Sequence, residues 1–306
     1  MRAGMTALGV AMALGAAGAA WGAVTVKQVR FEGWPHCYQL SNGTVEVVVV
    51  PQIGRIMRYG YVGDRNMIWV NPALKGKLAD PAQAAREWPN FGGDKLWPAP
   101  QSRWDWPPDA TLDSAPQTVE VLPNQHLKMT GQASAVAGLR FTREIALDET
   151  GTGVTITNTM TNTLDKHINW GVWEVTQVDD PDVVRLPLNR GGKFAAGYYT
   201  FKDADPPPGR LTLVGDEAHL KRDKEKSVKI GADSPQGWIR SEKGGRIFEV
   251  SATYETGKTY PDDGCGQEVY TNPDPLKYIE MELLSPMQTL APGASYSFTT
   301  HWRLSR

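Results

Sequence analysis

The sequence predicts an all-β protein built as a large antiparallel β-sandwich. Short segments rich in β-branched residues recur along the chain, helical periodicity is nearly absent, and the turn formers Gly (31) and Pro (22) are plentiful. About fifteen short strands need two packed sheets, and no repeated blade signature indicates a propeller. The 306 residues fit one all-β domain that spans residues 24–306.

Most of the strand segments precede residue 180. Thr44–Val50 is a nearly continuous β-branched run ended by Pro51, which is typical of a buried strand. Gly153–Asn162 instead alternates β-branched and polar residues, as in a strand with one solvent-exposed face. Asp80 as N-cap and Pro81 at the first helical position predict a short helix over Pro81–Glu87. The strands expected are Thr44–Val50, Arg55–Val62, Asn66–Val70, Thr118–Leu122, His126–Thr130, Leu139–Leu147, Gly153–Asn162 and His167–Val178.

Later strands are more loosely spaced. Asp203–Gly209, DADPPPG, is the most linker-like stretch of the chain. Strands flank it on both sides, so we interpret it as a long surface loop inside one domain. The strands expected here are Arg210–Val214, Ser227–Ile230, Gly237–Ser241, Arg246–Thr253, Glu268–Thr271, Lys277–Leu284 and Ser295–Leu304.

Residues 1–23 predict a secretory signal peptide. Arg2 is followed by an apolar run from Ala7 to Ala20, which is too short to span a bilayer, and by small residues suited to cleavage. We therefore expect a bacterial protein that is exported, periplasmic or secreted, with no membrane span after signal removal. In an oxidising compartment, Cys37 and Cys265 form either one disulfide or two buried thiols.

Charge and histidine content limit the partners and cofactors. With 32 basic and 34 acidic residues, the net charge of −2 gives no electrostatic basis for nucleic-acid binding. The five histidines show no metal-ligand spacing, so we expect neither a metal nor a cofactor. The oligomeric state is not indicated by the sequence.

The tryptophan-rich segment Trp88–Trp106, WPNFGGDKLWPAPQSRWDW, is the first candidate for a binding site. With Trp170 and Trp173, it holds six of the ten tryptophans that follow Trp21. Indole rings present flat apolar faces on which sugar rings stack, and charged or amide side chains bind hydroxyls. Any single indole could instead close the end of the sandwich. The candidate substrate-binding residues here are Asp94, Lys95, Trp97, Gln101 and Trp104.

The strand segment NWGVWEVTQ places a carboxylate among aromatic residues. Alternate residues of a strand share a face, so Trp173 and Gln177 lie on one face and Glu174 on the other. A buried unpaired carboxylate is costly, and we expect Lys95 or Arg55 to be the partner of Glu174. Glu174 is then either a structural charge or a site carboxylate.

The segment KYIEMELLSP carries two acids on one strand face. Glu280 and Glu282 are two residues apart and therefore point the same way. Like charges this close raise one of the two pKa values, which suits general acid–base chemistry. A solvent-facing sheet edge is the alternative.

Four motifs in chain order give the sequence a resemblance to the galactose mutarotase-like (aldose 1-epimerase) superfamily. They are SNGTVEVVVVPQIGRIMRYGY, FGGDKLWPAPQ, NWGVWEVTQ and VYTNPDPLKYIEMELLSP followed by LAPG. The resemblance extends from about Tyr38 to Trp302. It implies a supersandwich of antiparallel sheets with a sugar cleft on a concave face, and most closely an uncharacterised bacterial branch of the superfamily.

The resemblance also implies catalytic roles. The family uses a glutamate base, for which Glu282 is the best match and Glu280 the alternative. The family's histidine acid has no counterpart in FGGDKLWPAPQ, and the later strand has Glu174 next to a tryptophan instead. Lys95 or Glu174 could supply the acid.

Three functions therefore remain open. The first is an exported carbohydrate-binding protein that uses Trp97, Trp104 and Trp173 as stacking planes. The second is a sugar epimerase, isomerase or lyase, in which Arg55 and Lys95 would suit a uronate carboxylate. The third is a protein-interaction module whose partner binds the aromatic loop.

Overall fold

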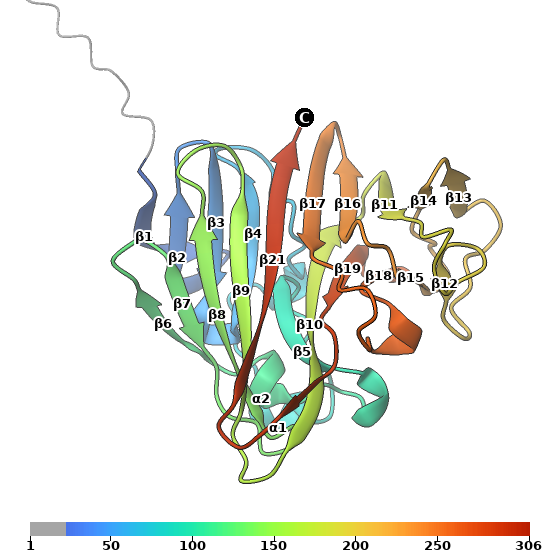
Figure 1. The fold of residues 1–306 in the computed structure, drawn as a ribbon. Coiled ribbons are helices and arrows are strands. Elements are labelled where there is room, and N and C mark those ends of the chain that lie inside the picture. The colour runs from blue at the N-terminus through green and yellow to red at the C-terminus, as the bar shows by residue number, and fades with distance from the viewer. Residues whose placement is uncertain (1–22) are drawn as a thin grey trace, which may run out of the picture.

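The structure is a computed structural model that describes residues 23–306. The predicted signal peptide therefore lies outside the described residues, except for Ala23. Two antiparallel sheets pack against each other, and the short helices α1 (Pro81–Ala84) and α2 (Ala110–Asp113) lie at one end of the sandwich (Figure 1). This architecture confirms the predicted all-β sandwich. Within residues 23–306, no helix is long and apolar enough to cross a membrane.

Both sheets of the described chain are antiparallel throughout. The first, eleven-stranded sheet contains, in spatial order, β1 (Thr25–Phe31), β2 (Trp34–Ser41), β3 (Val45–Val50), β4 (Arg55–Tyr61), β5 (Asp94–Ala99), β10 (Ile168–Asp179), β19 (Tyr278–Leu284), β18 (Gln267–Thr271), β15 (Val228–Ala232) and β12 (Tyr199–Thr200), with β20 (Gln288–Leu290) paired to β10. The second, ten-stranded sheet contains β13 (Leu211–Val214), β14 (Glu217–Leu220), β11 (Val183–Pro187), β16 (Trp238–Lys243), β17 (Arg246–Ala252), β21 (Ser295–Ser305), β9 (Val154–Asn162), β8 (Leu139–Leu147), β7 (Leu127–Thr130) and β6 (Thr118–Val121). Single 3₁₀ turns occupy Pro51–Ile53, Pro72–Leu74, Gln101–Arg103 and Asp262–Gly264.

The main core lies between the two sheets. On β9, Val154, Ile156 and Met160 face this core, while the threonines between them are partly exposed, as the alternating sequence predicted. Strand β19 is buried at every position, unlike β9. Its Ile279, Met281 and Leu283 face the core, so its two glutamates must be covered on the other face of the sheet.

Several segments differ from the sequence-based expectation. Strands β1, β2, β11 and β14 form where none was expected, and the helix expected over Pro81–Glu87 ends at Ala84. Two further differences bear on the site. Asn66–Val70 is not a ladder strand and makes only isolated bridges, because the Asn66 carboxamide oxygen accepts from the Tyr59 and Ile68 amides and holds a local turn. Conversely, the segment expected as an aromatic loop contains the central strand β5. This strand tolerates Pro98 because only one residue pair joins β5 to β4.

The two cysteines are free thiols, so the disulfide alternative does not hold in the structure. Cys37 packs with Trp34 and Val48 in a second apolar cluster, apart from the core between the sheets. Burial raises the pKa of the Cys37 thiol to about 11. Cys265 is also fully buried. Both side chains therefore behave as small apolar groups.

A buried polar network joins the two sheets through the core. Arg143 on β8 donates to Asp94 on β5, and its Nη2 lies 4.0 Å from Glu174 Oε1 on β10. Glu174 also accepts from Asn158, and from Thr300 at 2.7 Å. Burial, and next the repulsion from Asp94, raises the pKa of Glu174 to about 7.

We expect Glu174→Gln to change how stability depends on pH. Because the folded pKa of Glu174 exceeds the ordinary value of 4.5, the native state holds this proton more tightly, and wild-type stability falls as pH rises from about 4.5 to 7. The free energy of unfolding of the wild type, compared with that of the variant, should decrease by up to about 3 kcal/mol as the pH rises over this window, at about 1.4 kcal/mol per pKa unit. Urea unfolding between pH 4.5 and 8 measures this, and two parallel pH profiles would contradict it.

The turn before β5 requires glycine. Gly92 has φ +87°, and a Cβ added there would lie 2.3 Å from the carbonyl oxygen of Trp69. The carbonyl oxygen of Gly92 in turn accepts from Arg55 at 2.8 Å. The turn therefore fixes both the start of β5 and the Arg55 side chain.

Gly92→Ala should destabilise the protein through this backbone clash as well as through its positive φ. The matched control is Gly293→Ala, which has φ +73° but no atom within 4 Å of the added Cβ. The control should lose about 1–2 kcal/mol of unfolding free energy, and Gly92→Ala at least about 2 kcal/mol more. Equal losses in urea unfolding would show that the Trp69 carbonyl does not constrain the turn.

Candidate functional site

The candidate site lies on the face of the eleven-stranded sheet that is turned away from the core. A cleft of about 650 Å³ opens there over the central strands. The strand register explains which side chains meet: Lys95, Val175, Glu282 and Glu268 are aligned across β5, β10, β19 and β18. Two residues further along β5, and on the same face of the sheet, Trp97 pairs with Trp173 of β10. Alternation along four neighbouring strands thus gathers the charged and aromatic residues.

Two sets of ion pairs form the floor of the cleft. Lys229 Nζ lies 2.7 Å from Glu268 Oε2 and 2.9 Å from Glu282 Oε2. Glu282 also accepts from Trp173 Nε1 at 2.8 Å. Separately, Lys95 Nζ donates to Glu280 Oε1 at 3.2 Å. Both lysine ammonium groups also lie over indole rings, at 4.8 Å from the centroids of Trp97 and Trp173.

Burial shifts the pKa values of these groups. It raises the pKa of Glu280 and, more strongly, that of Glu268, while it lowers the pKa of Lys95. For Lys229, the attraction of Glu268 and Glu282 outweighs burial and raises its pKa. Apolar residues would stabilise a sheet at least as well as buried ion pairs do. Carboxylates and ammonium groups whose pKa values are shifted converge on this cleft, and they therefore mark it as the candidate functional site.

An aromatic wall borders the ion pairs. Trp97 and Trp173 meet edge to face at 5.2 Å between ring centroids, and Trp88 packs on Trp97 at 5.6 Å. Asp113 of α2 accepts from Trp97 Nε1 at 2.9 Å and from Trp88 Nε1 at 3.2 Å. Arg55 binds the same carboxylate at 2.8 Å. One buried ion pair therefore fixes two indole rings of the cleft.

Most of the residues predicted for the site come together. Trp97, Gln101, Trp173, Glu280 and Glu282 line the cleft. The structure thereby joins the tryptophan-rich segment, NWGVWEVTQ and KYIEMELLSP in one place.

Four further predicted residues lie around this cleft. Lys95 reaches the cleft through Glu280, and Gln177 lies on the same sheet face, fully buried opposite Glu280. Arg55 lies behind the aromatic wall, fully buried and paired with Asp113. Trp104 lines a neighbouring cavity instead.

Asp94 and Glu174 point away from the cleft. Strand alternation sends both side chains into the core, where they join the network around Arg143. The predicted partners of Glu174, Lys95 and Arg55, were wrong, because both basic residues lie on the other side of the sheet. In the structure, Glu174 is part of the contact between the sheets.

Sequence reasoning missed several residues of the cleft. Lys229 on β15 and Glu268 on β18 lie in segments that were expected as strands, and Phe201 precedes the loop at 203–209. Alternation puts Glu268 on the outer face of its strand, but the sequence does not reveal that β18 and β15 follow β19 in the sheet. Asp113 had no sequence signal beyond its place after the aromatic segment.

The fold resembles that of several solved structures. A galactose mutarotase related enzyme from Lactobacillus acidophilus is 9% identical, with 88% of this chain and 97% of that chain covered and a TM-score of 0.58. A galactose mutarotase-like protein from Clostridium acetobutylicum is 11% identical, with 93% and 99% covered and a TM-score of 0.60. A galactose mutarotase-like protein from Lactobacillus casei is 10% identical, with 88% and 100% covered and a TM-score of 0.58. The resemblance inferred from the motifs is therefore confirmed for the fold.

Comparison with curated proteins gives no match. A family described as a domain of unknown function, DUF4380, matches residues 36–305, which is most of the chain. The chain therefore belongs to the DUF4380 family and has the galactose mutarotase-like fold.

Proposed function

We propose that the protein binds a carbohydrate in the cleft over β5, β10, β19, β18 and β15. The observation that carries the proposal is the combination of indole faces with hydrogen-bonding charged groups in one cleft of about 650 Å³. Sugar rings combine an apolar C–H face with hydroxyl groups that donate and accept. The signal peptide expected from residues 1–23 would place this cleft outside the cytoplasm, and we include export in the proposal.

The aromatic side chains supply stacking surfaces at the cleft mouth. Trp106 is 52% exposed and packs edge to face on Trp88 and Trp97, at 5.2 and 6.2 Å between ring centroids. On the opposite side, Phe201 lies beneath the ammonium group of Lys229 at 4.8 Å. A ring held between these surfaces would have its hydroxyls within the cleft that Glu280 and Glu282 line.

The charges favour a neutral sugar over a uronate. Lys95 and Lys229 are each paired with carboxylates, and Arg55 is buried behind Trp97, so none of them is available to a ligand carboxylate. Lys202, which is exposed, is the lining cation that has no carboxylate partner within residues 23–306. A uronate would therefore bind through Lys202 rather than through Arg55 and Lys95.

A sugar screen by ligand-observed NMR tests carbohydrate binding. Neutral aldoses and their matching uronates should include at least one saturable ligand, and Trp106→Ala should weaken its binding about tenfold because a stacking face is lost. Tyr61→Ala is the matched control, since it removes a partly exposed aromatic ring outside the cleft. Absence of any saturable sugar would overturn the proposal and favour the protein-interaction alternative.

Catalysis is a second candidate function, and one observation favours it. Lys95 and Glu280 form a buried pair in which the lysine pKa is lowered and the glutamate pKa is raised. The two pKa values approach each other, which suits a proton donor and acceptor at neutral pH. Glu282, the family-based choice of base, is held by Trp173 and Lys229. In place of the histidine acid of the aldose 1-epimerases, Lys95 would then supply the proton through Glu280, which lines the cleft.

NMR exchange spectroscopy separates binding from catalysis, because it measures how fast the anomeric proton signals of the α and β forms of the sugar interconvert. An epimerase should lose at least about a hundredfold in exchange rate in Glu280→Gln or Glu282→Gln. A binding protein should accelerate no exchange, and its affinity should change little in Glu282→Gln. Glu120→Gln, an exposed carboxylate on β6, is the control. If both cleft variants interconvert the anomers as fast as the wild type does, the two glutamates are excluded as bases.

A further inference from the structure

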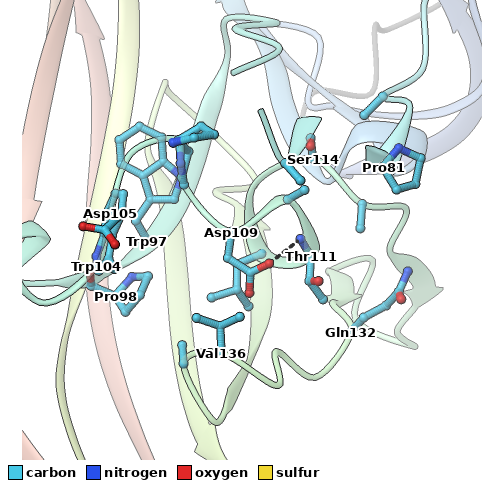
Figure 2. Close-up of a pocket in the computed structure, with 18 of the residues that line it drawn as sticks. Pro81, Trp97, Pro98, Trp104, Asp105, Asp109, Thr111, Ser114, Gln132 and Val136 are labelled. Atoms are coloured by element: carbon cyan, nitrogen blue, oxygen red, sulfur yellow. Dashed lines mark hydrogen bonds between the residues drawn. The ribbon is translucent and has the colours of Figure 1, made fainter. Parts of the chain in front are cut away.

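A second cavity, of about 680 Å³, lies at the end of the sandwich next to the cleft. It is formed by the end of β5 and the chain that follows it, by α1 and the residues that flank it, by the turn between β7 and β8, and by the start of β10. In the view of Figure 2, Trp97 and Trp104 lie on one side, Pro81 and Gln132 on the other, and Asp109 and Thr111 between them. Trp97 is the residue that lines both the cavity and the cleft.

The wall of this cavity consists mostly of flat or small apolar groups. Fifteen of its twenty-one lining residues are Pro, Ala, Trp, Leu or Val. The cation of this wall is Arg103, which is exposed, donates to the neutral Asn169 and lies over the ring of Trp170. The volume is within the range of small-molecule sites, and such sites are apolar with few polar groups. This wall is less suited to a sugar than the cleft.

Two buried polar atoms in the wall have no hydrogen-bond partner among the described residues. One is the hydroxyl of Ser114, a residue that is 1% exposed. The other is Oδ2 of Asp109, whose Oδ1 already accepts from the Thr111 amide at the start of α2. A buried polar group without a partner is destabilising, so native proteins normally satisfy such groups. Both residues line the cavity, where a ligand could supply the missing partner.

We propose that this cavity binds a flat apolar ring that carries a hydroxyl donor, as a phenol does. The ring would pack on the proline and indole faces, and its hydroxyl would donate to the hydroxyl of Ser114, the more deeply buried of the two residues. The ring is either a free small molecule or the aglycone of a glycoside whose sugar lies in the cleft beyond Trp97. The proposal does not require sugar binding, because a phenol alone tests it.

The test uses 4-ethylphenol, titrated into the full chain and followed by ligand-observed NMR. Saturable binding is expected, and the methyl ether 4-ethylanisole, which lacks the donor, should bind at least about fivefold more weakly. No saturable binding of 4-ethylphenol, or equal affinity for the two probes, would overturn the proposal. Adding 4-hydroxyphenyl β-glucoside distinguishes the sources of the ring: tighter binding than 4-ethylphenol indicates an aglycone, and weaker binding indicates a free ring.

Two variants locate the binding. Ser114→Ala should weaken 4-ethylphenol about fivefold while leaving the melting temperature unchanged or higher, because it removes a polar atom that has no partner. A structural role for Ser114 would instead lower the melting temperature. Ala110→Trp, on α2, should fill the cavity and abolish binding, whereas Tyr61→Ala, outside both cavities, should not. Wild-type affinity in both cavity variants would place the ring elsewhere and contradict the assignment.

Discussion

The buried ion pair between Arg55 and Asp113 determines the shape of the site. Arg55 comes from β4 and Asp113 from α2, so the pair ties the sheet to the irregular chain that follows β5. The same carboxylate orients the indole rings of Trp88 and Trp97 through their N–H groups. The buried carboxylate accepts from three donors, one of them charged. The end of the sandwich and the aromatic wall of the cleft therefore depend on one side chain.

The charged groups of the central strands are separated by the alternation of the sheet. Asp94 and Lys95 are adjacent in sequence, yet Asp94 binds Arg143 in the core and Lys95 binds Glu280 on the cleft side. Each face thus has its own cations and its own carboxylates. Because the sheet lies between them, the core network can hold the two sheets together without involving the cleft groups.

The sequence predicted the sandwich because its strand signals are local. Runs such as Thr44–Val50 and the alternation in Gly153–Asn162 need no knowledge of the rest of the chain, and β3 and β9 form there. Pairs at a spacing of two, such as Glu280 and Glu282, were predictable for the same reason. Strand order was not predictable, so the sequence did not indicate that Lys229 meets Glu282.

Local signals also failed where a long-range contact decided the outcome. Glu174 was assigned a basic partner from neighbouring motifs, but its partner comes from β8 in the opposite sheet. The aromatic segment was expected as a loop because of its glycines and prolines. Pairing with β10 makes part of it a central strand, since a β-ladder depends on the partner as much as on composition.

The tryptophan cluster has an optical consequence. Trp97 contacts Trp88, Trp104, Trp106 and Trp173, with ring centroids between 5.2 and 6.2 Å apart. Indoles this close transfer electronic excitation to one another, so the light absorbed by one ring is shared among the five. Its emission reports on the quencher or solvent nearest to any one member. Because Trp97 lines both the cleft and the neighbouring cavity, a change in either one should alter the tryptophan emission.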